Sequence, residues 1–147
     1  MRKIIPPLLF LFCILLMVAM KYLVVIVEIV PKPYNYLGIV LIILGIALTI
    51  VVRKRFEKTG TEIHTFRQPR KLVTNGPFKI SRNPFYLGFT ISLLGVWILL
   101  GTILPVIGMF IFITITNFYY IPFEEQMMQN TFGKEYKEYR FKVRKWI

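Results

Sequence analysis

Four long apolar runs constrain the fold of this chain more than any other feature of its sequence. They cover roughly residues 4–30, 34–52, 85–100 and 102–121. A transmembrane helix needs about 20 apolar residues, within a range of about 17 to 25, so the second and fourth runs fit well, the first is long and the third is short. A soluble domain with 56% hydrophobic residues would expose large apolar patches. We therefore predict a single all-α domain, integral to a membrane, with about four transmembrane helices.

The first and third apolar runs support more detailed expectations about the helices that they form. No small-residue cleavage site ends the first run, so we interpret it as a retained helix and not as a signal peptide. Lys21 and Glu28 are seven residues apart and would share one face of this helix. We expect the third helix to take Asn83 and Pro84 into its first turn, because proline suits the start of a helix.

The basic residues predict the topology. Two of the 19 Lys and Arg precede the first run, nine lie between the second and third runs, and six lie in the tail, whereas only Lys32 lies between the first and second runs. This asymmetry follows the positive-inside rule and places both termini and the 53–83 loop in the cytoplasm. The net charge of +12 is then explained by the attraction of these basic residues to the anionic headgroups of membrane lipids. We expect no nucleic-acid partner, because the charges follow the membrane borders.

The chain divides into an N-terminal helical hairpin, residues 1–52, and a second part, residues 53–147, which carries the polar motifs. The polar loop that begins at Arg53 is long, and such loops in small proteins are usually functional. His64, the only histidine, lies in this loop. No second histidine or cysteine cluster accompanies it, so we predict no metal site.

The C-terminal tail contains two patterns. Glu124 and Glu125 lie where the last apolar run ends, and ionisable groups in such places suggest function. Around Gly133, apolar residues recur at spacings of three and four, which predicts one face of a helix formed by Phe132, Tyr136, Tyr139, Val143 and Trp146. This amphipathic helix is either an interfacial anchor in the membrane plane or a lid over a ligand at the cytoplasmic end of the bundle.

Three sequence elements, in order, resemble the isoprenylcysteine carboxyl methyltransferase and phospholipid methyltransferase superfamily. They are residues 82–88 (RNPFYLG), the Glu124–Glu125 pair and residues 133–139 (GKEYKEY). The resemblance covers about residues 56–147, so that residues 53–147 would form a methyltransferase core. Asn83 stands where members acting on isoprenylcysteine carboxylates typically have histidine, and asparagine is frequent in prokaryotic members. A prokaryotic cytoplasmic membrane is therefore the expected location.

The resemblance implies S-adenosylmethionine as cofactor, bound at the cytoplasmic membrane face between the last two helices and the tail. Arg82 would pair with its carboxylate, and Glu124 or Glu125 would accept hydrogen bonds from its ammonium or ribose, or a proton from an amine acceptor. One of the two glutamates could instead be structural, bonded to Arg82 or to a tail lysine. The expected catalytic residues are Arg82, Glu124 and Glu125; the expected cofactor-binding residues are these three with Asn83, Pro84, Tyr86, Gly88, Tyr136 and Tyr139.

Several alternatives remain open at the level of sequence. The methyl acceptor would be a small lipophilic molecule that enters from the bilayer and offers a carboxylate, a thiol or an amine. A membrane reductase of related architecture would use NADPH instead. A non-enzymatic membrane protein or small transporter is the third alternative, although transporters tend to place ionisable groups near the bilayer midplane and not at its border.

Overall fold

The chain forms a helical bundle with a bent C-terminal extension. The computed structural model describes residues 5–23, 27–60 and 69–147, and the only strand-like pairing in these residues is one isolated bridge. The principal helices are α1 (Pro6–Leu23), α2 (Leu37–Thr59), α3 (Pro84–Leu100), α4 (Val106–Ile115) and α5 (Ile121–Lys142). Short 3₁₀ helices cover Tyr34–Tyr36 and Gly76–Lys79, and a π-helix, Thr116–Tyr120, joins α4 to α5.

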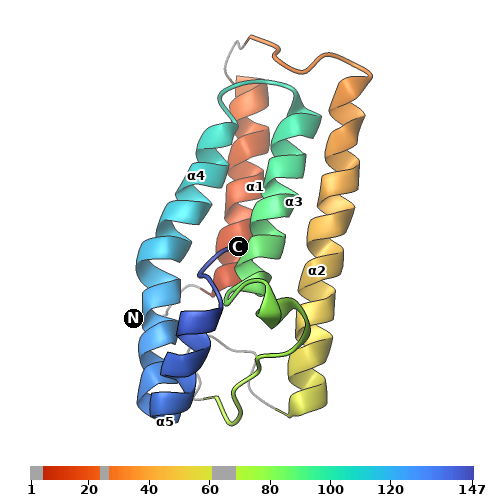
Figure 1. The fold of residues 1–147 in the computed structure, drawn as a ribbon. Helices are drawn as coiled ribbons and strands as arrows, with labels where there is room; N and C mark the ends of the chain where they lie inside the picture. Colours follow the sequence, from red (N-terminus) through yellow and green to blue (C-terminus); the bar gives the residue numbers. More distant parts are fainter. Residues whose placement is uncertain (1–4, 24–26, 61–68) are drawn as a thin grey trace.

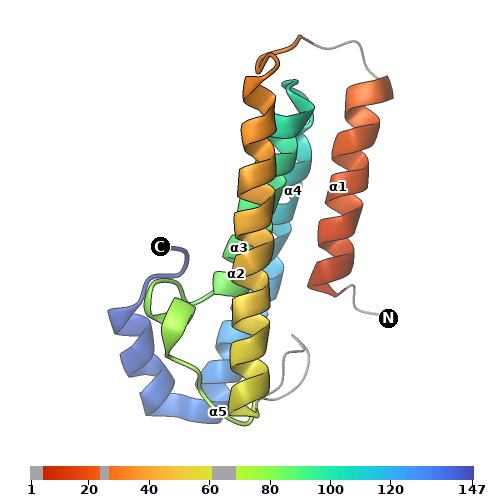
Figure 2. The same ribbon diagram turned by 90° about the vertical axis from the view of Figure 1, so that its right-hand side faces the viewer.

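Helices α1 to α4 run side by side, and α5 continues α4 past the start of α3 (Figures 1 and 2). Within the described residues, three helical segments are long and apolar enough to cross a membrane: Pro6–Leu23, Tyr34–Thr59 and Val106–Lys142. Helix α3 has 17 residues, at the lower limit for a span, and is apolar throughout. The predicted all-α membrane architecture is thereby confirmed.

The first apolar run does not form one helix, so the prediction that Lys21 and Glu28 share a helical face is wrong. Helix α1 ends at Leu23, and Glu28 forms an antiparallel bridge with Thr102 in the turn after α3. Lys21 Nζ donates a hydrogen bond to the Leu100 carbonyl at 2.7 Å. The last carbonyls of a helix lack partners within that helix, and this lysine satisfies one of them.

Two other boundaries differ from those expected. Helix α2 continues to Thr59 and ends at Gly60, whose φ of 66° suits a left-handed cap, so the first residues of the predicted 53–83 loop are helical. The fourth apolar run begins its helix at Val106 and not at residue 102. Asn83 and Pro84 do occupy the cap and the first position of α3, as predicted.

Glycines allow α2 and α3 to pack backbone against backbone. A Cβ at Gly95 would lie 2.5 Å from the Gly38 carbonyl oxygen, and one at Gly88 would lie 2.8 Å from the Gly45 carbonyl oxygen. Gly38 and Gly45 are seven residues apart on α2, and Gly88 and Gly95 are seven residues apart on α3, so both contacts lie on the same side of each helix. We call these two contacts the glycine seam. Close approach through small residues is typical of helix association in membranes.

Candidate functional site

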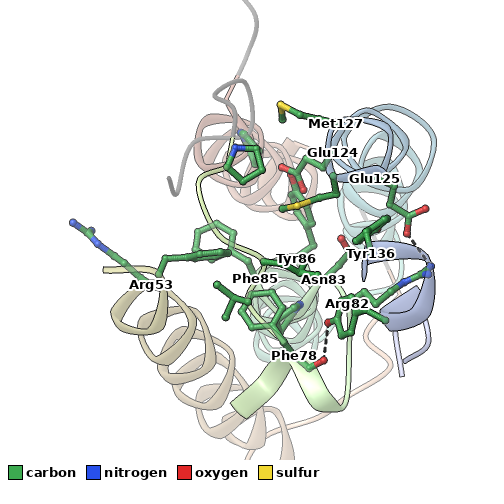
Figure 3. Close-up of a pocket in the computed structure, with 18 of the residues that line it drawn as sticks. Arg53, Phe78, Arg82, Asn83, Phe85, Tyr86, Glu124, Glu125, Met127 and Tyr136 are labelled. Carbon is green, nitrogen blue, oxygen red and sulfur yellow. Dashed lines mark hydrogen bonds and ion pairs between the residues drawn. The ribbon is translucent and has the colours of Figure 1, made fainter. Parts of the chain in front are cut away.

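A cavity of about 380 Å³ lies at the end of the bundle where α3 begins (Figure 3). Its walls come from the start of α1, the last turns of α2, residues 69–86 and both parts of α5. Its volume falls within the range of small-molecule and cofactor sites. The cavity exists because α2 and α5 extend past the start of α3 (Figure 2).

Eight of the nine predicted site residues line this cavity: Arg82, Asn83, Pro84, Tyr86, Glu124, Glu125, Tyr136 and Tyr139. The ninth, Gly88, lies outside its wall. A Cβ at Gly88 would lie 2.7 Å from Thr49 Cγ2 of α2, so the structure gives this glycine a role in helix packing. The three sequence elements, separated along the chain, are thus brought together around one space.

Arg82 and Glu125 form a buried ion pair in the wall. Their side chains are 8% and 15% exposed, and Arg82 Nη2 lies 2.8 Å from Glu125 Oε1. The second oxygen of Glu125 lies 3.9 Å from Arg140 Nη2. The 2.8 Å contact between Arg82 and Glu125 Oε1 is not a well-aligned hydrogen bond, because Glu125 Oε1 has no hydrogen-bond partner among the described residues. Arg82 Nε also has none among them. Glu125 is thus the one of the two glutamates that pairs with Arg82.

Glu124 has different surroundings from its neighbour. The Tyr86 hydroxyl donates a hydrogen bond of 2.8 Å to Glu124 Oε1, and the Tyr86 ring stacks on Tyr120 with centroids 6.2 Å apart. Tyr120 is the last residue of the π-helix, and π-helices are frequent at functional sites because they change which side chains face a given direction. Glu124 is thereby held at the cavity by a residue of α3.

The tail is fastened to the segment that precedes α3 chiefly through backbone carbonyls. Arg82 N donates to the Arg144 carbonyl at 3.0 Å, and Asn83 Nδ2 donates to the Lys145 carbonyl at 2.9 Å. Lys145 Nζ in turn donates to the Asn117 carbonyl in the π-helix at 3.2 Å. We call these three contacts the tail clasp. It uses Asn83 to hold the tail, although Asn83 also lines the cavity.

The aromatic face of the tail points inward, as a lid would. The backbone bends at Gly133, where φ is 50° and ψ is −113°, and the segment after it folds back beside the bundle (Figure 2). Tyr136 and Tyr139 are buried and pack with Val73 and Phe78. The predicted helical face extends too far, because α5 ends at Lys142 and the last two of its five residues, Val143 and Trp146, lie beyond the helix.

The Val106–Lys142 segment has 37 residues, more than the about 20 that one span requires, and the two tail tyrosines lie in its last part, after the bend at Gly133. Burial, assisted by the Glu125 carboxylate, raises the pKa of Tyr136 to about 12. Burial also raises the pKa of Tyr139, whose hydroxyl donates a 2.7 Å hydrogen bond to the Phe78 carbonyl. Both side chains can donate hydrogen bonds or offer aromatic faces, but neither is suited to act as a base.

Sequence reasoning missed most of the apolar lining. Phe78 and Phe85 lie next to the residues of the first motif, and Met127 and Met128 follow the glutamate pair, so proximity to the motifs could have indicated them. The start of α1, residues 5–7, carried no such signal. Arg53 also contributes to the wall, but its guanidinium points away from the cavity (Figure 3) and pairs with Glu57 at 2.9 Å.

The structure describes no group of three or more His, Cys, Asp or Glu residues, within residues 5–23, 27–60 and 69–147, that could hold a metal ion. His64 lies outside the described residues.

Comparison with known proteins identifies the family. The phospholipid methyltransferase family model matches residues 34–135, which is more than half of the chain. The chain belongs to the phospholipid methyltransferase family. The match begins at the turn before α2 and ends within the tail, so it includes the whole glycine seam and both glutamates.

Relatives of this phospholipid methyltransferase family member include two plant proteins. A "probable protein-S-isoprenylcysteine O-methyltransferase" of Oryza sativa is 31% identical over 112 residues, which is 74% of this chain and 58% of the rice protein. "Protein-S-isoprenylcysteine O-methyltransferase B" of Arabidopsis thaliana is 31% identical over 110 residues, 72% of this chain and 55% of the plant protein. The chain therefore spans little more than half the length of these relatives.

A bacterial relative is shorter. An uncharacterized protein of Haemophilus influenzae is 39% identical over 62 residues, which is 42% of this chain and 98% of that protein. No solved structure matches the chain. The family and the plant relatives support a membrane methyltransferase of the isoprenylcysteine or phospholipid type.

Proposed function

We propose that this membrane methyltransferase uses S-adenosylmethionine and acts at the cytoplasmic membrane face on a small lipid-like acceptor. One observation carries the proposal: the 82–86 segment, the glutamate pair and the tail tyrosines line a single cavity. Family membership supports methyl transfer. The concentration of basic residues on one side of the predicted spans supports the cytoplasmic orientation.

The chemistry of the cavity wall fits the cofactor. S-adenosylmethionine has a carboxylate, an ammonium group, ribose hydroxyls and a flat adenine. Arg82 Nε is a buried donor without a hydrogen-bond partner among the described residues, and a guanidinium suits a carboxylate. Glu124 can accept from the ammonium or the hydroxyls, and Tyr136 and Phe78 offer aromatic surface for the base. When bound, the cofactor supplies a methyl group on a sulfonium, ready for displacement.

The protein's own contribution is to align the reactants and exclude water. Alignment alone can supply about 7–11 kcal/mol of a reaction barrier. The tail clasp holds the aromatic face of the tail over the cavity, which limits access from that side. If the acceptor is an amine, Glu124 is placed to take the proton that the nitrogen loses; a carboxylate or thiolate acceptor requires no base.

The cavity is polar on one side and apolar on the other, which supports separate places for cofactor and acceptor. Arg82, Glu125 and Tyr136 lie toward the tail, whereas Met127 and Phe85 lie toward α1 and α2 (Figure 3). Residues 5–7 of the α1 end extend the apolar wall. The cofactor would occupy the tail side, and an amphiphile from the bilayer would occupy the α1 side. The names of the plant relatives make an isoprenylcysteine-like carboxylate one candidate acceptor, alongside a lipid amine or thiol.

The proposal is tested with membranes that contain the full chain, incubated with a methyl-labelled cofactor. We expect label in the organic extract, because the acceptor is lipophilic, and about 10- to 100-fold slower labelling when Glu124→Gln replaces the wild type. Label confined to water-soluble products, or equal labelling by both proteins, would contradict the proposed acceptor class and site.

A further inference from the structure

A second hollow lies on the outer side of the tail. It is lined by Arg82, Gln129, Lys137, Arg140 and Phe141. Of these residues, only Arg82 also lines the inner cavity. The Arg82 guanidinium therefore forms part of the wall between the two spaces, and the other four residues belong to the outer hollow, which the proposed methyl transfer does not use.

The charges of the hollow favour an anion. Among the residues that the structure describes, its lining contains three cations and no acidic residue. Glu125 is the acidic group behind it, and this single carboxylate is shared between Arg82 and Arg140 at 2.8 and 3.9 Å. Lys137 is exposed, and the Arg140 side chain is 56% exposed, so both can reach a ligand. The Arg140 guanidinium and the Lys137 ammonium suit the several oxygens of a phosphate, and the buried Arg82 guanidinium adds positive charge behind them.

The position of the hollow relative to the start of the apolar helix α3 indicates the source of that anion. Arg82 directly precedes the apolar helix α3, and its backbone nitrogen donates to the Arg144 carbonyl at 3.0 Å. The end of the tail therefore lies at the level at which α3 enters the apolar layer. Phe141 lines the hollow near this level and is 83% exposed. Lys137 comes four residues earlier on the same helix and lies about one helical turn farther from the apolar layer. An exposed aromatic ring beside cations is the arrangement of an interfacial element.

We propose that this hollow binds the phosphate of an anionic phospholipid, with Phe141 against the apolar part of the same lipid. The attraction of juxtamembrane cations to anionic headgroups supplies the driving force. The tail stands on the opposite side of the bundle from α1 (Figure 2), so a lipid bound there would hold the tail against the membrane without occupying the apolar side of the inner cavity.

The test uses the full chain in a neutral detergent, titrated with three probes: dihexanoylphosphatidylglycerol, dihexanoylphosphatidylcholine and inorganic phosphate. We expect the anionic lipid to bind at least tenfold more tightly than the other two. Lys137→Gln with Arg140→Gln should weaken its binding at least tenfold. The control, Lys134→Gln with Lys142→Gln, removes the same charge from tail residues outside the hollow and should change binding less than threefold.

Phe141→Ser provides a second variant that leaves all ion pairs in place. It should weaken binding of the anionic lipid but not of inorganic phosphate. Equal losses in the two glutamine pairs would show diffuse charge attraction and overturn the site. Phosphate binding as tight as lipid binding would overturn the lipid assignment, and absence of lipid binding to the wild type would overturn both.

Discussion

The two adjacent glutamates, Glu124 and Glu125, make different contacts in the structure. Glu125 is buried against Arg82, whereas Glu124 accepts the Tyr86 hydroxyl at the cavity. Consecutive helical residues point about 100° apart, so this difference was foreseeable, but which residue would face which way depended on the π-helix before them. Sequence reasoning selected the pair and could not divide its roles.

The first prediction concerns Glu124 and its hydroxyl partner. Glu124→Gln should lower kcat/KM about 10- to 100-fold, because a hydrogen bond to a charged group contributes about 1.5–3 kcal/mol. Tyr86→Phe should have a smaller effect in the same direction, since it removes only the donor that positions Glu124. Methyl-transfer kinetics measure both. Tyr119→Phe, a half-exposed tyrosine outside the cavity wall, is the control and should match the wild type.

The second prediction concerns the buried ion pair. Arg82→Ala should lower the free energy of unfolding by about 3–5 kcal/mol, because Glu125 is left as a buried charge without its main partner. Adding Glu125→Gln should restore part of that loss. Denaturation of the single and double variants in detergent measures this. If the double variant were as unstable as Arg82→Ala, the pair would not be the source of the effect.

At the scale of elements, the bend of α5 at Gly133 brings Tyr136 and Tyr139 of the tail into the cavity wall. The sequence pattern predicted the aromatic face that includes Tyr136 and Tyr139. It could not decide between anchor and lid, because the same face suits a bilayer or a protein surface. The packing of Tyr136 and Tyr139 against Val73 and Phe78 favours the lid.

The third prediction concerns this bend. Gly133→Ala should weaken cofactor binding several-fold, because φ of 50° with ψ of −113° is strained for alanine and the tail would tend to straighten. Space is not the reason, since a Cβ at this position meets nothing within 4 Å. Gly60→Ala is a matched control with φ of 66° and equally open space, at the end of α2. Its cofactor affinity should not change.

The fourth prediction tests the packing role of Gly88. Gly88→Ala should lower the midpoint of thermal unfolding in protein without cofactor, because the new methyl group meets Thr49 and the Gly45 backbone. The cofactor should restore as much stability to the variant as to the wild type. A variant of normal stability that binds cofactor poorly would instead support the cofactor contact first expected for Gly88.

At the scale of the whole molecule, the membrane architecture and the meeting of three motifs were predictable, and the contributions of α1 and α2 were not. Apolar run lengths set the number of helices, and the resemblance connected residues far apart in the chain. Residues 5–7 line the cavity without any motif to mark them, and the seven-residue spacing of Gly38 and Gly45 acquires meaning only beside Gly88 and Gly95. Such contacts depend on which helices become neighbours, which short-range patterns do not determine.

The central claim is that the cavity beneath α3 is a site for S-adenosylmethionine. Calorimetric titration of the purified full chain, with the methyl donor and separately with NADPH, tests it most directly. We predict binding of one S-adenosylmethionine per chain, weakened at least tenfold by Glu124→Gln, and no heat of binding with NADPH. Binding of NADPH alone, or S-adenosylmethionine affinity that Glu124→Gln leaves unchanged, would contradict the account.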